Sequence, residues 1–193
     1  MTQRDHILSY LAEIARLIEG LGALAPQIEA AADMWVEALS AGNKVIFCGN
    51  GGSAADAQHL AAELMGRFLI DRNPLAALSL TVDTSALTAI GNDYGFDKVF
   101  SRQLRGLAKA GDVLFGMSTS GNSGNVVDAF LTARELGVKT IGLTGQSGGR
   151  MAALSDLLIA APHDKTNHIQ EAHIAIGHLI CALTEAALCS PRP

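Results

Sequence analysis

Residues 44–63 read KVIFCGNGGSAADAQHLAAE, a short apolar run that passes through a glycine-rich turn into a pattern typical of a helix. A buried parallel strand ends in this way when a crossover helix follows it. At the start of such a helix, free backbone N–H groups and the positive end of the helix dipole can hold an anion. His59 and Glu63 are four residues apart, so an imidazole and a carboxylate share one helix face and can converge on one atom. The stretch therefore predicts an anion site beside a proton-transfer or metal-binding pair.

The same alternation of apolar run and helical pattern continues along the chain. It predicts strands at residues 44–48, 75–82, 112–117, 138–143 and 156–161, and helices at 53–66, 84–91, 97–109, 122–136, 147–154 and 166–189. Strands that alternate with helices specify a doubly wound α/β fold, whose ligands lie beyond the carboxyl ends of the strands. We therefore expect a single domain over residues 1–193, built on a five-stranded parallel sheet, with a long C-terminal helix and a loose tail at 190–193.

Two amphipathic helices are expected before the first strand. Apolar residues recur at helical spacing over residues 3–19 and 24–41. Gly20, Gly22 and Pro26 interrupt the pattern between them, and this break predicts a helical hairpin over residues 1–41. No residue of the hairpin has evident chemistry, so we expect its apolar face to pack on the domain or on a neighbouring subunit.

The composition excludes several classes of protein. Of the 193 residues, 49% are hydrophobic and only 5% aromatic, which indicates an interior of small side chains or large surfaces buried between subunits. The net charge of -5 and the scattered basic residues argue against nucleic-acid binding. Three cysteines without CxxC spacing suit a reducing compartment, and neither a signal-peptide pattern nor an uninterrupted apolar run of membrane-spanning length is seen. We expect an oligomer in the cytoplasm that binds neither nucleic acid nor membrane.

Two further turns carry candidate ligand groups. Ser118-Thr-Ser-Gly-Asn-Ser123 follows a predicted strand and leads into a helix, so its hydroxyl and backbone donors can hold a phosphate without a fixed positive charge. Such a cradle fits a sugar phosphate better than nucleic acid, although Ser120 or Asn122 could instead only cap the helix. Asn92 and Asp93 lie in a predicted turn and could bind sugar hydroxyls or serve the turn alone.

The predicted C-terminal helix carries His178 among isoleucines and leucines. An unpaired imidazole would be costly there, and a lone histidine is more often a satisfied core residue, but the pair at His59 and Glu63 favours a functional role. Gln170 lies eight residues before His178, about 12 Å along a straight helix, so both reach one ion only if their side chains lean together or come from different subunits. Gln170 and its neighbours Glu171 and His173 could equally be solvated.

With these motifs assembled, the chain resembles the sugar isomerase (SIS) family of phosphosugar-binding domains and, within it, the phosphoheptose isomerases. The resemblance runs nearly end to end. Its most specific segments are CGNGGSAADAQH (48–59), AE (62–63) with GRF (66–68), GNDYGF (91–96), STSGNS (118–123), LTG (143–145) with GG (148–149), and IQEAH (169–173) with His178. Several independent motifs in the same order make coincidence improbable.

The resemblance implies a SIS-type, flavodoxin-like domain in a homotetramer whose active sites are built between subunits. It implies an aldose–ketose isomerase that converts D-sedoheptulose 7-phosphate to D-glycero-D-manno-heptose 7-phosphate through an enediol, the first step toward ADP- or GDP-heptose. The product could feed lipopolysaccharide, capsule, S-layer glycan or antibiotic sugar synthesis.

The resemblance also implies roles for single residues. One zinc ion per subunit would be bound by His59, Glu63, Gln170 and His178, with Glu63 and His178 as acid and base. The substrate-binding residues that it implies are Asn50, Gly51, Gly52, Ser53, Glu63, Asn92, Asp93, Ser118, Thr119, Ser120, Ser123 and Gln170.

Two alternatives to this function stay open. An isomerase of another sugar phosphate would share the phosphate cradle. A non-catalytic SIS-domain protein would sense a phosphosugar or bind a replication initiator. The family's replication-associated members lack the catalytic carboxylate and the terminal-helix histidine, whereas this chain has Glu63 and His178, which favours the enzyme.

Overall fold

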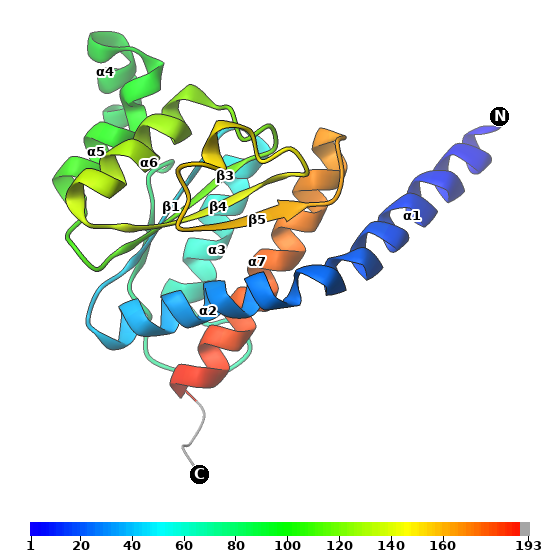
Figure 1. Ribbon diagram of the computed structural model, residues 1–193, viewed down its shortest axis with the longest axis horizontal. Coiled ribbons are helices and arrows are strands. Elements are labelled where there is room, and N and C mark those ends of the chain that lie inside the picture. Colours follow the sequence, from blue (N-terminus) through cyan, green and yellow to red (C-terminus); the bar gives the residue numbers. More distant parts are fainter. Residues whose placement is uncertain (190–193) are drawn as a thin grey trace.

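A five-stranded parallel sheet forms the centre of the molecule, with the strand order β2-β1-β3-β4-β5 (Figure 1). The structure is a computed structural model that describes residues 1–189, so the expected tail at 190–193 lies outside the described residues. The strands are β1 (Val45–Gly49), β2 (Ala77–Ser79), β3 (Val113–Ser118), β4 (Lys139–Gly145) and β5 (Leu157–Ala161). The direction of winding reverses between β1 and β3, which makes their carboxyl ends the switch point where ligands of this fold bind. The predicted doubly wound α/β class is confirmed.

Helices cover both faces of the sheet. They are α1 (Gln3–Gly20), α2 (Ala25–Ser40), α3 (Gly52–Met65), α4 (Thr84–Tyr94), α5 (Val99–Leu107), α6 (Gly124–Leu136) and α7 (Thr166–Cys189), with 3-10 turns η1 (Leu21–Leu24), η2 (Phe96–Lys98) and η3 (Gly149–Met151). Because side chains alternate along a strand, Val45 and Phe47 join the core under α2, α3 and α7, while Ile46 and Cys48 join the core under α5 and α6. The helices that carry His59 and His178 therefore lie on the same face.

Three of the predicted segments differ from the structure by more than two residues. The strand expected at 75–82 is ordered as a strand only over Ala77–Ser79, because β2 is an edge strand that pairs with β1 alone. The helix expected at 147–154 is only the turn η3, since Gly148 and Gly149 have left-handed φ values of 69° and 52° that an α-helix cannot contain. The first three residues of the predicted turn at 92–96 instead form the last turn of α4, which ends at Tyr94 and has Gly95 as its C-cap.

The two N-terminal helices do not form the predicted hairpin. Figure 1 shows α1 continuing outward from the end of α2 at a bend, rather than folding back along it. The physical reason lies in the backbone between them: Gly20 has helical angles (φ -64°, ψ -21°), and Gly22 is not among the glycines with positive φ. Pro26 lies in the first turn of α2, where its missing N–H breaks no helical hydrogen bond. These three residues therefore allow the chain to continue from α1 into α2 through the 3-10 turn η1.

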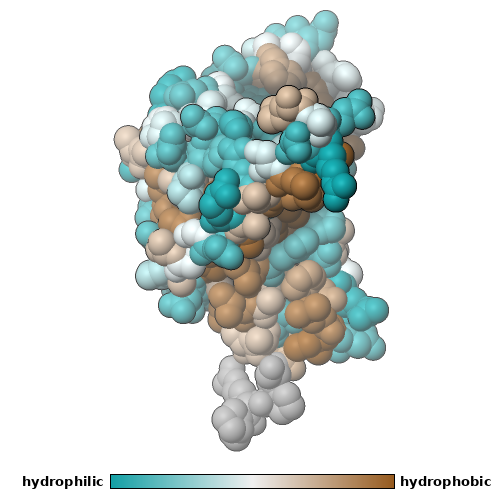
Figure 2. All heavy atoms as spheres, turned by 90° about the vertical axis from the view of Figure 1, so that its right-hand side faces the viewer, coloured by the Kyte–Doolittle hydropathy of each residue, from teal (hydrophilic) through white to brown (hydrophobic). Residues whose placement is uncertain are grey.

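An apolar groove runs beside this bend. Figure 2 shows hydrophobic residues gathered in the lower half of the face turned toward α1. The groove has a volume of about 640 Å³, and its lining comes from α1, α2, α7 and the loop after α3, including Ile18, Leu69, Leu179 and Leu183. Each of these four side chains is at least 40% exposed in the single chain. The groove reaches His178 at one side.

Among the described residues, α7 alone is long and apolar enough to cross a membrane. Its buried residues, which include Ile169, Ile176 and Ile180, pack in the core shared with α2 and α3. This packing accounts for the apolar residues on the buried side of the helix, whereas Leu179 and Leu183 line the groove.

Candidate active site

His59, Glu63 and His178 meet where α3 and α7 lie side by side. His59 Nε2 is 2.9 Å from His178 Nε2 and 3.2 Å from Glu63 Oε1. One ligand atom from each of the three side chains lies within 4.8 Å of the others. The site is open to solvent, since the His59 side chain is 48% and the Glu63 side chain 21% exposed. The structure thus brings together three of the four residues that the sequence suggested as metal ligands.

A glycine sets the distance between the two helices. A Cβ atom at Gly177 would lie 2.7 Å from both Cδ atoms of Leu60, which is fully buried. Gly177 precedes His178, and Leu60 follows His59, so the close approach at these two positions determines the separation of the imidazoles. The ring of Phe68 stacks on the imidazole of His178, with centroids 5.5 Å apart and an interplanar angle of 23°.

The three side chains form a suitable donor set for a divalent metal ion. Imidazole nitrogen and carboxylate oxygen are common zinc ligands, and a zinc site used in catalysis keeps a position open for substrate. Two imidazole nitrogens 2.9 Å apart can share only one proton, whereas a cation between them would take both lone pairs. Gln170, the fourth suggested ligand, has its amide over the first glycine turn, where a Cβ at Gly52 would lie 2.6 Å from Gln170 Oε1.

The first glycine turn joins β1 to α3. Gly51 has φ 55° and ψ -121°, a conformation that only glycine adopts readily, and its carbonyl accepts the N–H groups of Ala54 and Ala55. The side chain of Asn50 exchanges two 2.8 Å hydrogen bonds with Asn125 in α6. Asn50 therefore ties the first turn to the second, and its amide already has partners within the chain.

The second turn, residues 118–123, leaves β3 at the same edge of the sheet, because Gly49 of β1 is paired with Met117 of β3. Ser118 Oγ lies 2.8 Å from Ser123 Oγ and 3.5 Å from Ser120 Oγ, so three hydroxyls converge. Ser123 is the N-cap residue of α6 but makes no capping hydrogen bond, and the Oγ atom of Ser120 accepts the N–H of Asn122 within the turn. The hydroxyl cluster is therefore not explained by helix capping.

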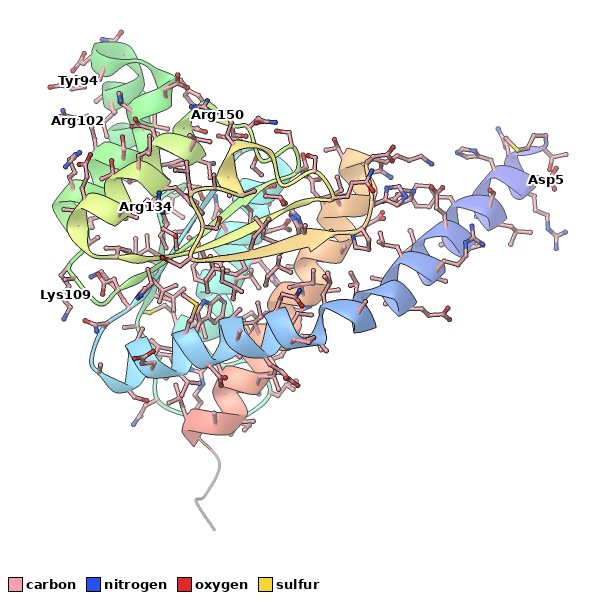
Figure 3. All side chains as sticks on the ribbon, viewed as in Figure 1. Asp5, Tyr94, Arg102, Lys109, Arg134 and Arg150 are labelled. Carbon is pink, nitrogen blue, oxygen red and sulfur yellow. The ribbon has the colours of Figure 1, made fainter. Side chains whose placement is uncertain are left out.

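Asn92 and Asp93 lie on the other side of the molecule from α7. Both are exposed in the last turn of α4, where Asn92 Nδ2 donates to Asp93 Oδ1 at 2.8 Å. The main contacts of α4 are with α5 and η2, and Figure 3 shows Tyr94 and Arg102 on the outer surface there, with the guanidinium over the aromatic ring. Within one chain, these contacts do not connect Asn92 and Asp93 to the histidine cluster.

Several residues that shape the site were not identified from the sequence. Asn125, Arg72 and Glu185 act through hydrogen bonds to residues far away in the chain. A signal existed for Glu185 alone: it follows His178 by seven residues, so an acidic side chain shares the buried face of an apolar helix. The sequence also left His173 as a possible solvated residue, but it is fully buried, and burial lowers its pKa to about 4 although its imidazole bonds the Thr144 carbonyl.

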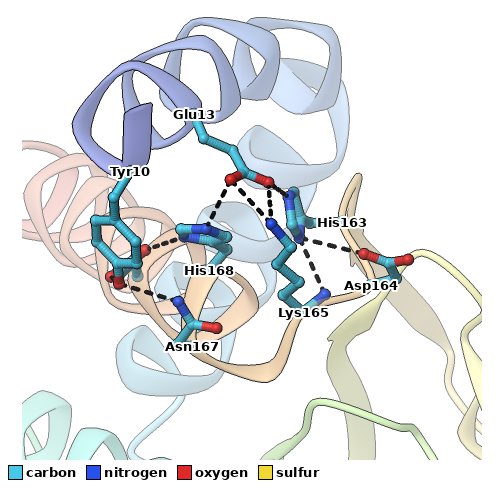
Figure 4. Close-up of polar contacts among 8 residues, drawn as sticks. Tyr10, Glu13, His163, Asp164, Lys165, Asn167 and His168 are labelled. Carbon is cyan, nitrogen blue, oxygen red and sulfur yellow. Dashed lines mark hydrogen bonds and ion pairs between the residues drawn. The ribbon is translucent and has the colours of Figure 1, made fainter. Parts of the chain in front are cut away.

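A second cluster of histidine and carboxylate groups joins α1 to the start of α7 (Figure 4). Glu13 accepts from Lys165 Nζ at 2.6 and 2.9 Å, and this ammonium group holds the pKa of Glu13 at about 2. His163 Nδ1 accepts the N–H of Lys165, so a neutral His163 carries its proton on Nε2, facing Glu13. His168 bonds Glu171 through Nδ1. Because Lys165 pairs with the carboxylate of Glu13 and the imidazole of His163 presents a proton to it, we interpret the cluster as a structural joint for α1 and not as a metal site.

Comparison with known proteins gives concordant results. The model of the SIS domain family matches residues 9–145. A phosphoheptose isomerase of Rhodospirillum rubrum is 56% identical over 186 residues, covering 96% of this chain and 99% of that protein. A phosphoheptose isomerase of Akkermansia muciniphila is 54% identical over 181 residues, covering 94% and 96%. The solved structure of phosphoheptose isomerase from Neisseria gonorrhoeae superposes with a TM-score of 0.91 at 46% identity, covering 96% of this chain and all of that one.

Proposed function

This chain belongs to the SIS domain family, and from that membership we propose that it interconverts D-sedoheptulose 7-phosphate and D-glycero-D-manno-heptose 7-phosphate. Relatives that are 54% and 56% identical over nearly the whole chain are phosphoheptose isomerases. The observation that carries the proposal is the convergence of His59, Glu63 and His178 where α7 packs on α3, the helix that begins at the sheet's switch point. The chain is thus an aldose–ketose isomerase at the first step of heptose precursor synthesis.

Glu63 and His178 carry the proton transfers in this proposal. One of them removes the proton from the carbon beside the substrate carbonyl, which leaves an enediol. The other relays a proton at the neighbouring oxygen or carbon. Side chains that act in this way must reach the substrate within hydrogen-bond distance, and the two groups lie close enough to serve one small molecule.

Zinc is the proposed metal ion, with one ion per subunit. His59, Glu63 and His178 would hold it, and Gln170 would complete the set by turning from its place over Gly52. When bound, the ion polarises the carbonyl and hydroxyl oxygens of the substrate. His59 has no other task in the proposal and serves as a ligand only.

The phosphate group of the substrate binds at the two turns in this proposal. The N-terminus of α3 supplies backbone N–H groups at Gly51, Gly52 and Ser53, and the second turn supplies hydroxyls. The residues assigned from the second turn are Ser118, Thr119, Ser120 and Ser123. Asn50 contributes by holding the turns together through Asn125.

The proposal includes a homotetramer in the cytoplasm, with no nucleic-acid or membrane partner. The exposed apolar groove beside α1 supports assembly, since monomeric proteins rarely expose such a surface. Within one chain, α4 is remote from the histidine cluster. In the assembly, a neighbouring subunit would bring its Asn92 and Asp93 to this cluster. The net charge of -5 supports the lack of a nucleic-acid partner.

Substrate profiling tests the proposed function. The purified protein is incubated with sedoheptulose 7-phosphate, a hexosamine 6-phosphate and a pentose 5-phosphate, and the products are identified by mass spectrometry and NMR. We expect turnover of the heptose phosphate alone, reduced by a chelator and restored by added zinc. Turnover of another sugar phosphate instead would assign a different isomerase, and binding without turnover of any would favour a sensor.

A further inference from the structure

A buried ion pair joins the loop after α3 to the end of α7. Arg72 Nε donates to Glu185 Oε1 at 3.0 Å, and only 4% and 1% of the two side chains are exposed. Removing two charges from water costs free energy that a single ion pair seldom recovers unless further hydrogen bonds satisfy both groups. Further hydrogen bonds of this pair reach the backbone of Glu63 and of Phe68, the residue that stacks on His178.

Glu185 fixes the loop segment that contacts His178. Its carboxylate accepts the backbone N–H groups of Phe68, Leu69 and Ile70 at 3.1, 2.6 and 2.8 Å. The ring of Phe68 stacks on the imidazole of His178. Because an aromatic neighbour limits the rotation of a ring packed against it, Glu185 restrains the orientation of His178 through Phe68.

Arg72 fixes the end of the helix that carries Glu63. Its guanidinium donates to the carbonyl of Glu63 at 2.8 Å and to those of Leu64 and Gly66 at 2.8 and 3.2 Å. The last carbonyls of a helix have no partner within the helix, and α3 has no basic residue of its own in its last turn. Arg72 therefore caps α3 from the following loop and holds the backbone of Glu63 in place.

We propose that Arg72 and Glu185 are positioning residues of the isomerase site, with one ion pair that sets Glu63 through its carbonyl and His178 through Phe68. The inference rests on the proposed function. Neither residue is required to touch the substrate. The turns assigned to phosphate binding are joined by the Asn50–Asn125 bonds instead, so loss of the ion pair should lower kcat more than it raises KM.

Glu185→Gln tests the proposal because it keeps the shape of the side chain and removes its charge. We expect kcat to fall by about tenfold or more, with KM changed by less than about threefold, since displacement of a reacting group by about 1 Å can cost two orders of magnitude in rate. Asp112→Asn is the matched control: Asp112 is also a buried carboxylate, and it accepts two backbone N–H groups and an ammonium, but before β3 at the other end of the sheet. The control should keep kcat and KM within about twofold when both variants are assayed below their unfolding temperatures.

Phe68→Leu and Phe68→Tyr provide a second test that does not disturb the ion pair. Loss of the ring in Phe68→Leu should lower kcat, as Glu185→Gln does, and Phe68→Tyr should keep most of the wild-type kcat. Wild-type kcat in Glu185→Gln, or an equal fall in Glu185→Gln and Asp112→Asn, overturns the proposal. If Glu185→Gln does not fold, the Phe68 pair decides, and an unchanged kcat in Phe68→Leu overturns it.

NMR signals of the His178 ring separate this inference from the proposed function. A stacked aromatic ring shifts the carbon-bound protons of its neighbour, so in metal-free protein these signals should move in both Glu185→Gln and Phe68→Leu and stay unchanged in Asp112→Asn. Signals that stay unchanged in all three variants overturn the positioning role. Failure of the wild type to isomerise the heptose phosphate overturns the proposed function alone.

Discussion

Asp56 lies one turn before His59 on α3, and its Oδ2 atom is buried without a hydrogen-bond partner among the described residues. Burial raises the pKa of Asp56 to about 6, although the nearby His59 opposes the shift. A carboxyl group whose pKa is higher in the folded state binds its proton more tightly there. Its contribution to stability is therefore complete below pH 3.8 and is lost as the pH rises through 6.

Asp56→Asn should therefore stabilise the metal-free protein at pH 8, by about 1–2 kcal/mol after allowance for partial exposure, and change little at pH 4. Denaturant unfolding of chelator-treated protein at the two pH values measures this. The exposed Asp33→Asn serves as a control that should shift the midpoint little at either pH. An equal increase in the free energy of unfolding at both pH values would show that burial of the Asp56 charge is not the cause of the stabilisation.

At the scale of residues, a pair with a local signature is predictable from the sequence, whereas a contact between two residues far apart in the chain is not. His59 and Glu63 could be paired because helical spacing places them on one face. Asn50 and Asn125 are 75 positions apart, and Arg72 and Glu185 are 113 apart, so their contacts depend on how the elements pack. No local pattern specifies such a pair before the fold is known.

At the scale of elements, the approach of α7 to α3 determines the geometry of the site. Gly177→Ala would place a methyl group against Leu60, whose buried side chain has little space to move. We expect kcat to fall because His178 moves away from His59. The free energy of unfolding should change by less than the usual overpacking cost of about 1–3 kcal/mol, because alanine favours the helix over glycine by about 1 kcal/mol.

Gly106→Ala in α5 is the control for this prediction, because a Cβ there meets nothing within 4 Å. It should leave kcat unchanged and raise the unfolding midpoint slightly. Steady-state kinetics and thermal unfolding of both variants provide the measurement, and wild-type kcat in Gly177→Ala would show that the helix separation is not critical.

The strands and most helices were predictable, while the connection between α1 and α2 was not. Apolar runs followed by small polar residues predicted all five strands, with boundaries that differ by a few residues. Gly20 and Gly22 indicated a reversal of the chain, but glycine permits left-handed φ without requiring it, and here the backbone stays helical. The sequence of a glycine-rich junction does not decide between these two outcomes.

For the whole molecule, the apolar groove predicts an interface. Leu183 is 43% exposed in the groove, so Leu183→Glu should reduce the molar mass measured by light scattering while the subunit stays folded. Leu131→Glu on α6 changes an equally exposed leucine outside the groove and should leave the mass unchanged. A wild-type protein with the mass of a single chain would contradict the expected tetramer.

His173 makes the stability of the whole domain sensitive to acid. Burial lowers its pKa from 6.5 to about 4, so the unfolded chain takes up a proton in this range and the folded protein does not. The free energy of unfolding should therefore fall by up to about 3 kcal/mol as the pH drops from 6.5 to 4. His173→Gln can still donate to the Thr144 carbonyl and should flatten this dependence in denaturant unfolding, and an unchanged slope would assign the acid sensitivity to other groups.

The central claim is that Glu63, placed beside His59 and His178, transfers a proton in an aldose–ketose isomerisation. The most direct test is incubation with sedoheptulose 7-phosphate in D₂O, with NMR detection of deuterium at the substrate carbon next to the carbonyl, for wild type and Glu63→Gln. We predict deuterium incorporation and glycero-manno-heptose 7-phosphate with the wild type, and neither with Glu63→Gln, although calorimetry should show that the variant still binds the phosphosugar. Deuterium incorporation by Glu63→Gln at the wild-type rate would contradict the account.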